Sequence, residues 1–306
     1  MDKQKLESER IDKAVRYIWQ HLDQELNLEE LAATALYSTY HFLRIFKSVI
    51  GETPNKYITR LRMESAAHTI TLNPERPILN VAIDVGYQSL ESFSRAFKSF
   101  YSISPQSFKN SEQTEKLTII QKRNSNPFIK KVIQEGGYGE VQDPASKDKH
   151  LEIEIIKLPE QKLVTLQTNL ASPEKITGEF NNMTRWASAH ELIQNGQYPF
   201  GVLNDFPLFT PYDKCRFLIC LPARHKDLVS QPMHFLELPP RKYAKFVSLG
   251  DIDKIIRDMI HVAHQWLPET GHKVINDMAL MIPVNDPCKV SFSENTYEIL
   301  MPVVAV

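Results

Sequence analysis

Two stretches of sequence, Phe42–Ser48 (FLRIFKS) and Phe93–Ser99 (FSRAFKS), lie 51 residues apart and share F, R, F, K and S in register. Thr53-Pro54 and Ser104-Pro105 repeat at the same offset. A motif that recurs at a fixed offset indicates a duplicated structural unit, because chance rarely preserves both motif and spacing. Residues four apart share one face of a helix. In each stretch the two phenylalanines are therefore predicted core residues, and the arginine between them is predicted to face outward.

Helical signals surround both stretches, from residue 9 to residue 109. Asn27, with Glu30 three residues on, forms a capping-box-like start. Gly51 can end the helix of the first motif, and Thr53-Pro54 starts a helix that runs to about Leu72. Further helices are expected to begin near Ser38, Ser89 and Ser104, and the apolar stripe of the first helix comprises Ile11, Val15, Ile18 and Leu22.

A short helix followed by a tight turn and a second helix is typical of helix-turn-helix units, which insert the second helix into the DNA major groove. Two such units predict a protein that reads double-stranded DNA. The helix between them, from Pro54 to Leu72, has 19 residues. It would span about 28 Å, which suits two readers separated by one DNA turn of about 34 Å.

The outward residues of both second helices are the candidates for DNA contact. An isolated arginine on a helix is usually a surface charge, but a duplicated arginine in this motif favours contact with guanine or phosphate. The predicted base-facing residues are Tyr40, Leu43, Arg44, Leu90, Glu91, Ser92 and Arg95, whereas Lys47, Lys56, Arg60 and Lys98 are predicted to be phosphate contacts or solvated charges.

Residues from about 9 to 109 resemble the AraC/XylS regulators through the pattern A-x-x-x-G-[FY], then S-x-F-x-R-x-F-K and S-P. The sequence departs from the pattern at Leu36, where the first turn usually has glycine, and at Tyr101-Ser102, which replaces Phe-Gly. The resemblance implies two sets of base readers, Tyr40, Leu43 and Arg44 in the first unit and Glu91, Ser92 and Arg95 in the second.

Changes in composition divide the chain into three segments. Residues 1–110 are predicted to be the DNA-binding domain. Residues 111–149 mix basic residues with Gly, Pro and Ser, and are predicted to be a linker with one short element. In residues 150–306, strand-like runs alternate with two helical segments, which indicates an α+β effector-binding domain. The predicted fold class is multidomain, and the predicted strands cover residues 151–158, 162–168, 215–222, 233–238 and 242–249.

The last segment also repeats, at an offset of 80. Leu158-Pro159 matches Leu238-Pro239, and Trp186 matches Trp266. Two similar α+β units related in this way usually pack side by side, and their seam is the natural place for a ligand.

This segment resembles the GyrI-like, or SOUL-like tandem, domains that follow such DNA-binding domains in the Rob-type architecture. The resemblance implies a small effector, often a cationic aromatic compound that faces an acidic residue. Met281 occupies the usual position of that glutamate, with Asp277 on the same face if the segment is a strand. A thioether offers apolar, polarizable surface, so a neutral or weakly polar effector, or none, is expected. The candidate pocket residues, for which core packing is the equal alternative, are Trp186, Phe206, Trp266 and Met281.

Composition and charge limit the other classes of protein to which this chain could belong. The net charge is −1, so any DNA-binding charge must be local. The charged start and the lack of an apolar run of about 20 residues predict a cytoplasmic protein. Cys215, Cys220 and Cys288 lie outside any CxxC and are predicted to be reduced thiols, and the pair His261 and His264 has no third ligand at fixed spacing. Neither a metal nor a cofactor is expected.

Two other functions fit parts of the sequence. Some relatives of the second domain hydrolyse small electrophiles with a pocket acid, and such a domain could also sequester a ligand. Met281 leaves no acid at that position, so the protein is not expected to be an enzyme. The retained Arg44 and Arg95 disfavour a protein that has lost DNA binding. The expected protein is a monomeric activator on a bipartite promoter site, with RNA polymerase as a partner, although sequence does not distinguish activator from repressor.

Overall fold

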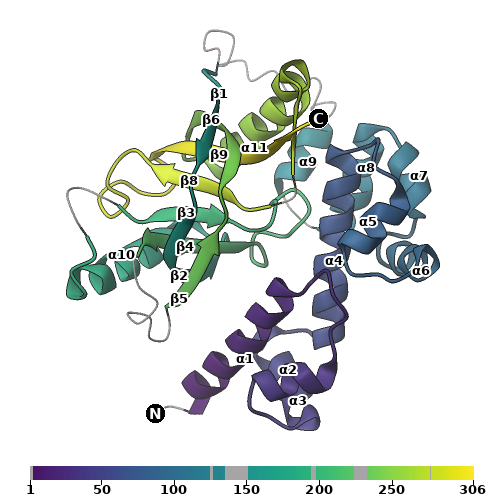
Figure 1. The fold of residues 1–306 in the computed structure, drawn as a ribbon, viewed down its shortest axis with the longest axis horizontal. Coiled ribbons are helices and arrows are strands. Elements are labelled where there is room, and N and C mark those ends of the chain that lie inside the picture. The colour runs from purple at the N-terminus through teal and green to yellow at the C-terminus, as the bar shows by residue number, and fades with distance from the viewer. Residues whose placement is uncertain (1–2, 125–126, 135–150, 194–197, 224–232, 276) are drawn as a thin grey trace. The chain divides into compact units, whose positions relative to one another are not determined.

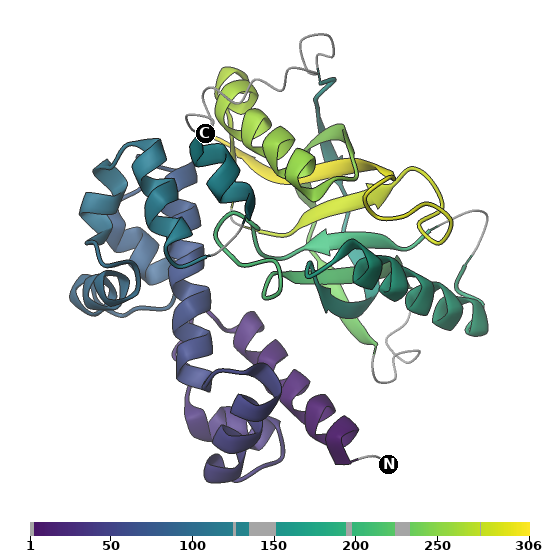
Figure 2. The same cartoon turned by 180° about the vertical axis from the view of Figure 1, so that it is seen from behind.

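The computed structural model divides the chain into two compact units, Met1–Ser111 and Glu112–Val306 (Figures 1 and 2). The residues that it describes are 3–124, 127–134, 151–193, 198–223, 233–275 and 277–306.

The first unit is helical, and one long helix holds two groups of shorter ones. Figures 1 and 2 show the first group, which comprises α1, α2 and α3, at one end of α4. The second group, which comprises α5, α6 and α7, lies at the other end. The helices are α1 (Lys3–Gln20), α2 (Leu28–Thr34), α3 (Thr39–Ile50), α4 (Pro54–Leu72), α5 (Ile78–Asp84), α6 (Leu90–Tyr101) and α7 (Pro105–Asn110).

Polar caps start most of these helices where the sequence predicts them. The side chain of Asn27 accepts a hydrogen bond from the backbone N–H of Glu29 at the start of α2. Thr53 and Ser104 cap α4 and α7 in the same way, each followed by proline in the first turn. Ser38 differs from the prediction, because it holds the N-cap position of α3 without a side-chain cap bond.

The duplicated phenylalanines form the core of each group. Phe42, Phe46, Phe93 and Phe97 are completely buried. Ring centroids lie 5.4 Å apart in the first pair and 5.6 Å apart in the second. Burial of each ring contributes about 1.5–3 kcal/mol to folding, so the repeat encodes the packing of both groups.

Both departures from the family pattern keep the backbone geometry that glycine would provide. Leu36 has a φ of 56° and Ser102 a φ of 63°, in the left-handed region. Leu36 in the turn before α3 and Ser102 at the C-cap of α6 therefore adopt a backbone conformation in which their Cβ atoms are sterically strained.

The first part of the predicted linker contains more regular structure than the one short element that the sequence predicts. Two helices, α8 (Gln113–Gln121) and α9 (Pro127–Gln134), lie there and belong to the second unit. Each helix buries apolar residues at a spacing of three. At most 1% of the surface of each of these residues is exposed: Leu117 and Ile120 in α8, and Ile129 and Val132 in α9. This narrow apolar face is hard to recognise among the Lys and Asn residues around it. Residues 135–150 lie outside the described part of the chain.

The second unit contains one antiparallel sheet, whose order along the sheet is β1-β6-β9-β8-β3-β4-β2-β5, with β7 paired to β9. The predicted strands correspond to β1, β2, β4, β5 and β6, whereas β3, β7, β8 and β9 are absent from the prediction. Strand β3 is short and contains Gly201. The strands are β1 (Glu154–Leu158), β2 (Gln161–Asn169), β3 (Phe200–Leu203), β4 (Arg216–Pro222), β5 (His234–Leu238), β6 (Arg241–Leu249), β7 (His272–Val274), β8 (Ala279–Pro283) and β9 (Thr296–Ala305).

The register of this sheet repeats at the same offset of 80 as the sequence. In β2 and β4, Leu163 pairs with Pro222; in β6 and β9, Tyr243 pairs with Pro302. The halves also exchange edge strands, since β1 pairs with β6 and β5 pairs with β2. They meet where β3 pairs with β8, and there Gly201 lies opposite Met281, its own equivalent.

Two helical segments cover one face of the sheet, as Figure 2 shows. They are α10 (Pro173–Ala189) and α11 (Ile252–His261), the latter continuing through a π-helical turn (Val262–Trp266) and a 3-10 turn (Leu267–Thr270). Ser248 of β6 donates a hydrogen bond to Asp258 of α11 at 2.5 Å, which identifies the face of β6 that lies against this helix.

Candidate nucleic-acid interface

The outward face of α3 is open to solvent. Tyr40 is 83% exposed, Arg44 and Lys47 are exposed, and Leu43 is partly buried. Nη2 of Arg44 lies 3.3 Å from Nε2 of His41, one turn earlier. These side chains form a polar and aromatic surface directly above the buried phenylalanines, so a rigid core holds their helix in place.

The equivalent face of α6 has the same character. Leu90 is 42% exposed, and Glu91, Arg95 and Lys98 are also exposed. Arg95 forms an ion pair with Glu91 on the helix surface. Such exposed pairs contribute at most about 1 kcal/mol, so an incoming phosphate or base can replace Glu91 at low cost.

Ser92 differs from its neighbours on α6. Its backbone N–H donates to Oγ of Ser89 at 3.2 Å, and its own hydroxyl lies 3.0 Å from the carbonyl oxygen of Ser89. The hydroxyl is thus used in the helix start and is only partly exposed.

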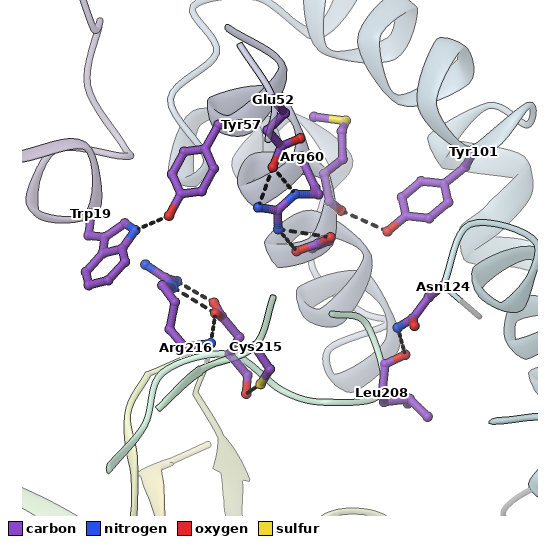
Figure 3. Close-up of polar contacts among 12 residues, drawn as sticks. Trp19, Glu52, Tyr57, Arg60, Tyr101, Asn124, Leu208, Cys215 and Arg216 are labelled. Atoms are coloured by element: carbon purple, nitrogen blue, oxygen red, sulfur yellow. Dashed lines mark hydrogen bonds and ion pairs between the residues drawn. The ribbon is translucent and has the colours of Figure 1, made fainter. Parts of the chain in front are cut away.

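Arg60 corrects the prediction of a phosphate contact or a solvated charge. It is 8% exposed and forms ion pairs with Glu52 at 2.8 Å and Glu64 at 3.1 Å (Figure 3). Burial alone would lower the pKa of Arg60, but the two carboxylates raise it above its ordinary value. The arginine stays charged and fixes the loop after α3 to α4. Lys56, on the same helix, is exposed.

Two further contacts attach the helix groups to α4 (Figure 3). The indole N–H of Trp19 donates to the hydroxyl of Tyr57 at 2.8 Å. In the middle of α4, the hydroxyl of Tyr101 donates to the carbonyl oxygen of Met63 at 3.4 Å. Trp19 of the first group and Tyr101 of the second group therefore each attach to α4 through a hydrogen bond. The first group contains α3 and the second contains α6, the two helices with the candidate DNA-contact residues.

In the second unit, Met281 lies at the meeting point of the two halves and is completely buried. Phe246 and Met281 both pair with Ile299 on β9, so all three face the helices. Across the seam, a Cβ on Gly201 would lie 2.2 Å from the Phe217 ring. The surroundings of Met281 are thus apolar and closely packed.

The other three pocket candidates are partly exposed. Trp186 on α10 stacks on His190 with ring centroids 4.5 Å apart, and Trp266 ends the π-helical turn at the equivalent position of the second half. Phe206, in the loop after β3, lies 6.1 Å from Phe209. The structure places the two tryptophans on the helix layer and Met281 in the sheet beneath it.

The loop that carries Phe206 is fixed at both sides. Asp205 forms an ion pair with Arg216 and accepts a hydrogen bond from its backbone N–H at 2.8 Å. Asn124, just after α8, donates to the carbonyl oxygen of Leu208 at 3.3 Å (Figure 3). The residue Asn124, which follows α8, therefore contacts the loop that carries the candidate pocket residue Phe206.

Asp277 does not share a strand face with Met281, because β8 begins two residues later, at Ala279. Its carboxylate forms an ion pair with Arg241 and accepts from the backbone N–H of Met278. Within the described ranges, no three His, Cys, Asp or Glu side chains gather in a group that could hold a metal ion. None of the helices placed by the structure is both long and apolar enough to cross a membrane.

Comparisons with known families match both units. Residues 31–111 match a helix-turn-helix domain model, and residues 151–304 match the GyrI-like small molecule binding domain. The chain belongs to the AraC/XylS family and carries a GyrI-like domain. The predicted family and fold class are confirmed.

Relatives of this AraC/XylS protein include the transcriptional regulator Rob of Salmonella typhimurium, 39% identical over 93 residues that cover 30% of this chain and 32% of Rob. The regulatory protein SoxS of the same organism is 33% identical over 100 residues, 33% of this chain and 92% of SoxS. The chain spans about a third of the length of the first curated relatives it matches. The crystal structure of the EcmrR C-terminal domain is also similar, with 13% identity, a TM-score of 0.41, and coverage of 52% of this chain and 100% of that one.

Proposed function

We propose that this AraC/XylS protein is a sequence-specific DNA-binding transcription regulator that reads a bipartite site in double-stranded DNA. The observation that supports this most is the duplicated exposed face of α3 and α6, carried at the two ends of a 19-residue helix. A helix of that length spans about 28 Å, close to one DNA turn. One chain can therefore place two helices in successive major grooves, and we propose that it acts as a monomer.

The proposed base readers are the exposed residues of those two helices. Arg44 and Arg95 suit bidentate contact with guanine, and Lys47 and Lys98 suit phosphate. The ion pair between Arg95 and Glu91 must open for this contact, and Ser92 would contribute through its partly exposed side only. Tyr40, Leu43 and Leu90 supply apolar contact surface.

The test is selection of duplexes from a random library by the full chain at near-physiological salt, followed by sequencing. Two short conserved blocks about one helical turn apart are expected. The double variant Arg44→Ala, Arg95→Ala is the matched control, and it should lose the blocks while keeping salt-sensitive binding to any duplex. Absence of enrichment with the wild-type chain would contradict the proposed function.

We further propose that the GyrI-like domain binds a small neutral or weakly polar effector. The support is Met281, a completely buried thioether set among Phe217, Phe246 and Ile299, at the position where the resemblance implies a glutamate. Asp277 is balanced by Arg241, so we do not favour hydrolysis with that acid. Thermal shifts with neutral and cationic aromatic compounds of matched size test this, and stabilisation by the cations alone would contradict it.

The proposed regulatory action is activation, with RNA polymerase as the protein partner. Transcription in vitro from a promoter that carries the selected site measures it directly. Increased transcript supports activation, and decreased transcript would identify a repressor.

A further inference from the structure

A single arginine in the middle of α4 contacts both helix groups of the DNA-binding unit. Nε of Arg62 donates to the carbonyl oxygen of Leu22 at 3.0 Å, and Nη2 donates to the carbonyl oxygen of Gln24. These acceptors lie in the loop between α1 and α2, in the first group. The same guanidinium lies over the ring of Tyr87, 5.5 Å from its centroid, in the turn between α5 and α6.

The turn of the second group also packs directly on the loop of the first. Gly86 has a φ of 81°, and a Cβ built there would lie 2.6 Å from Nη2 of Arg62 and 2.6 Å from the carbonyl oxygen of Leu22. Beside this contact, the side-chain amide of Gln88 donates to the carboxylate of Glu25 at 3.0 Å. The two groups are therefore joined by side-chain contacts as well as by the helix backbone.

The first group contains a matching arrangement that lacks this connection. Arg10 of α1 lies 5.1 Å from the ring centroid of Tyr37, and its Nη1 is 3.5 Å from the carbonyl oxygen of Leu36. Leu36 occupies the turn position of Gly86, has a φ of 56°, and is 63% exposed. A leucine fits there because its turn faces solvent. In the second group the turn meets the first group, and the position is glycine.

We propose that Arg62, packed on Gly86 and Tyr87, sets the spacing and orientation of the two reading helices, and so is a positioning residue for recognition of a bipartite site. The inference rests on the proposed function. When one reader is bound, the effective concentration of the second at its own block depends on how rigidly the connection holds it at the required distance. Loss of the arginine leaves the backbone of α4, the Gln88–Glu25 hydrogen bond and the packing of Gly86 on the Leu22 carbonyl group as connections, and it broadens that distance.

The experiment measures affinity of the full-length wild-type and Arg62→Ala chains for three duplexes taken from the library selection. One carries both blocks at the selected spacing, one carries both with two base pairs inserted, and one carries the first block alone. On the first duplex the variant is expected to bind about tenfold more weakly, because the gain from linked sites shrinks. On the single block it should bind within about twofold of wild type, and it should lose most of the wild-type preference for the selected spacing.

Arg10→Ala is the matched control, since it removes an arginine–tyrosine contact that stays inside the first group. It should leave the spacing preference unchanged. Arg62→Lys keeps the charge but not the forked geometry that reaches two carbonyls and a ring, and it is used if Arg62→Ala fails to fold. Unchanged spacing preference in the folded Arg62 variant, or equal weakening on all three duplexes, would overturn the inference. A wild-type chain that selects no blocks would instead contradict the proposed function.

Discussion

Arg44 and Lys47 lie within one turn of each other on the exposed face of α3, yet we expect their removal to have different effects. Arg44→Ala should weaken binding by about 1–3 kcal/mol on the selected site and relax the preference at one base pair, because a bidentate contact is lost. Lys47→Ala should weaken binding to all sequences alike and reduce the salt dependence, since only a phosphate contact is lost. Titration of selected and single-substituted duplexes measures both effects. Equal losses on every duplex for Arg44→Ala would contradict its role as a base reader.

Met281 provides a second prediction for a single residue. Met281→Glu places a carboxyl group at a completely buried position, where burial raises the pKa of the group in the folded state above that in the unfolded state. The folded variant therefore favours the protonated form. Relative to wild type, its free energy of unfolding should fall by about 1.4 kcal/mol per pH unit above a pH of about 4.3, until the pH passes the raised pKa.

Urea unfolding of the variant and the wild type between pH 5 and pH 8 gives this difference. Met281→Gln is the control, because an amide carries no charge and should cost the same at each pH. If the two variants behave alike at all pH values, the carboxylate must be hydrated, and Met281 then lines a wet pocket rather than a dry core.

Helix ends and turns give a prediction at the level of elements. Gly51 and Gly86 both have left-handed φ values, 86° and 81°. No atom lies within 4 Å of a Cβ added to Gly51, whereas one added to Gly86 would overlap Arg62 and the Leu22 carbonyl group. Gly51→Ala should cost about 1 kcal/mol from backbone strain alone. Gly86→Ala should cost about 1–3 kcal/mol more, because the two helix groups must also move apart.

Thermal or urea unfolding of the two variants compares these losses directly. Leu36→Gly, at the equivalent turn of the first group, serves as the reference for relief of strain without a change in packing. Equal losses for the two alanine variants would show that the turn of the second group can withdraw from the first without cost.

At the scale of the whole molecule, the division into two compact units predicts independent roles. The matched segment of this chain corresponds to 92% of SoxS, so a comparable length exists as a nearly complete protein. We expect a fragment of residues 1–111 to select the same two DNA blocks as the full chain. Its binding should not change with any compound that stabilises the GyrI-like domain.

Library selection with the fragment, in parallel with the full chain, tests this prediction. A fragment that folds, as judged by circular dichroism, but selects no blocks would show that the second unit takes part in DNA recognition.

Much of this architecture is readable from sequence because its signals are local. Helix caps such as Asn27 and Thr53 act within three residues, and a buried stripe such as that of Phe42 and Phe46 lies within two helical turns. The offsets of 51 and 80 add the information that each unit is duplicated. Local periodicity and repetition were therefore enough to determine the tandem helix-turn-helix domain, the α+β repeat and the exposed faces of α3 and α6.

Tertiary structure alone decided which charges are buried and which strands are neighbours. Nothing near Arg62 in sequence distinguishes it from a solvated charge, because the carbonyl groups that it binds lie 38 and 40 residues away. The carboxylate partners of Arg60 are close in sequence, but its burial depends on the packing of α4 against other helices. The same holds for α8 and α9, whose apolar faces are defined by what they pack against. The exchange of β1 and β5 between the two halves depends on pairing partners some 80 residues apart. Such features are set by contacts between distant segments, and a short window of sequence holds only one side of each contact.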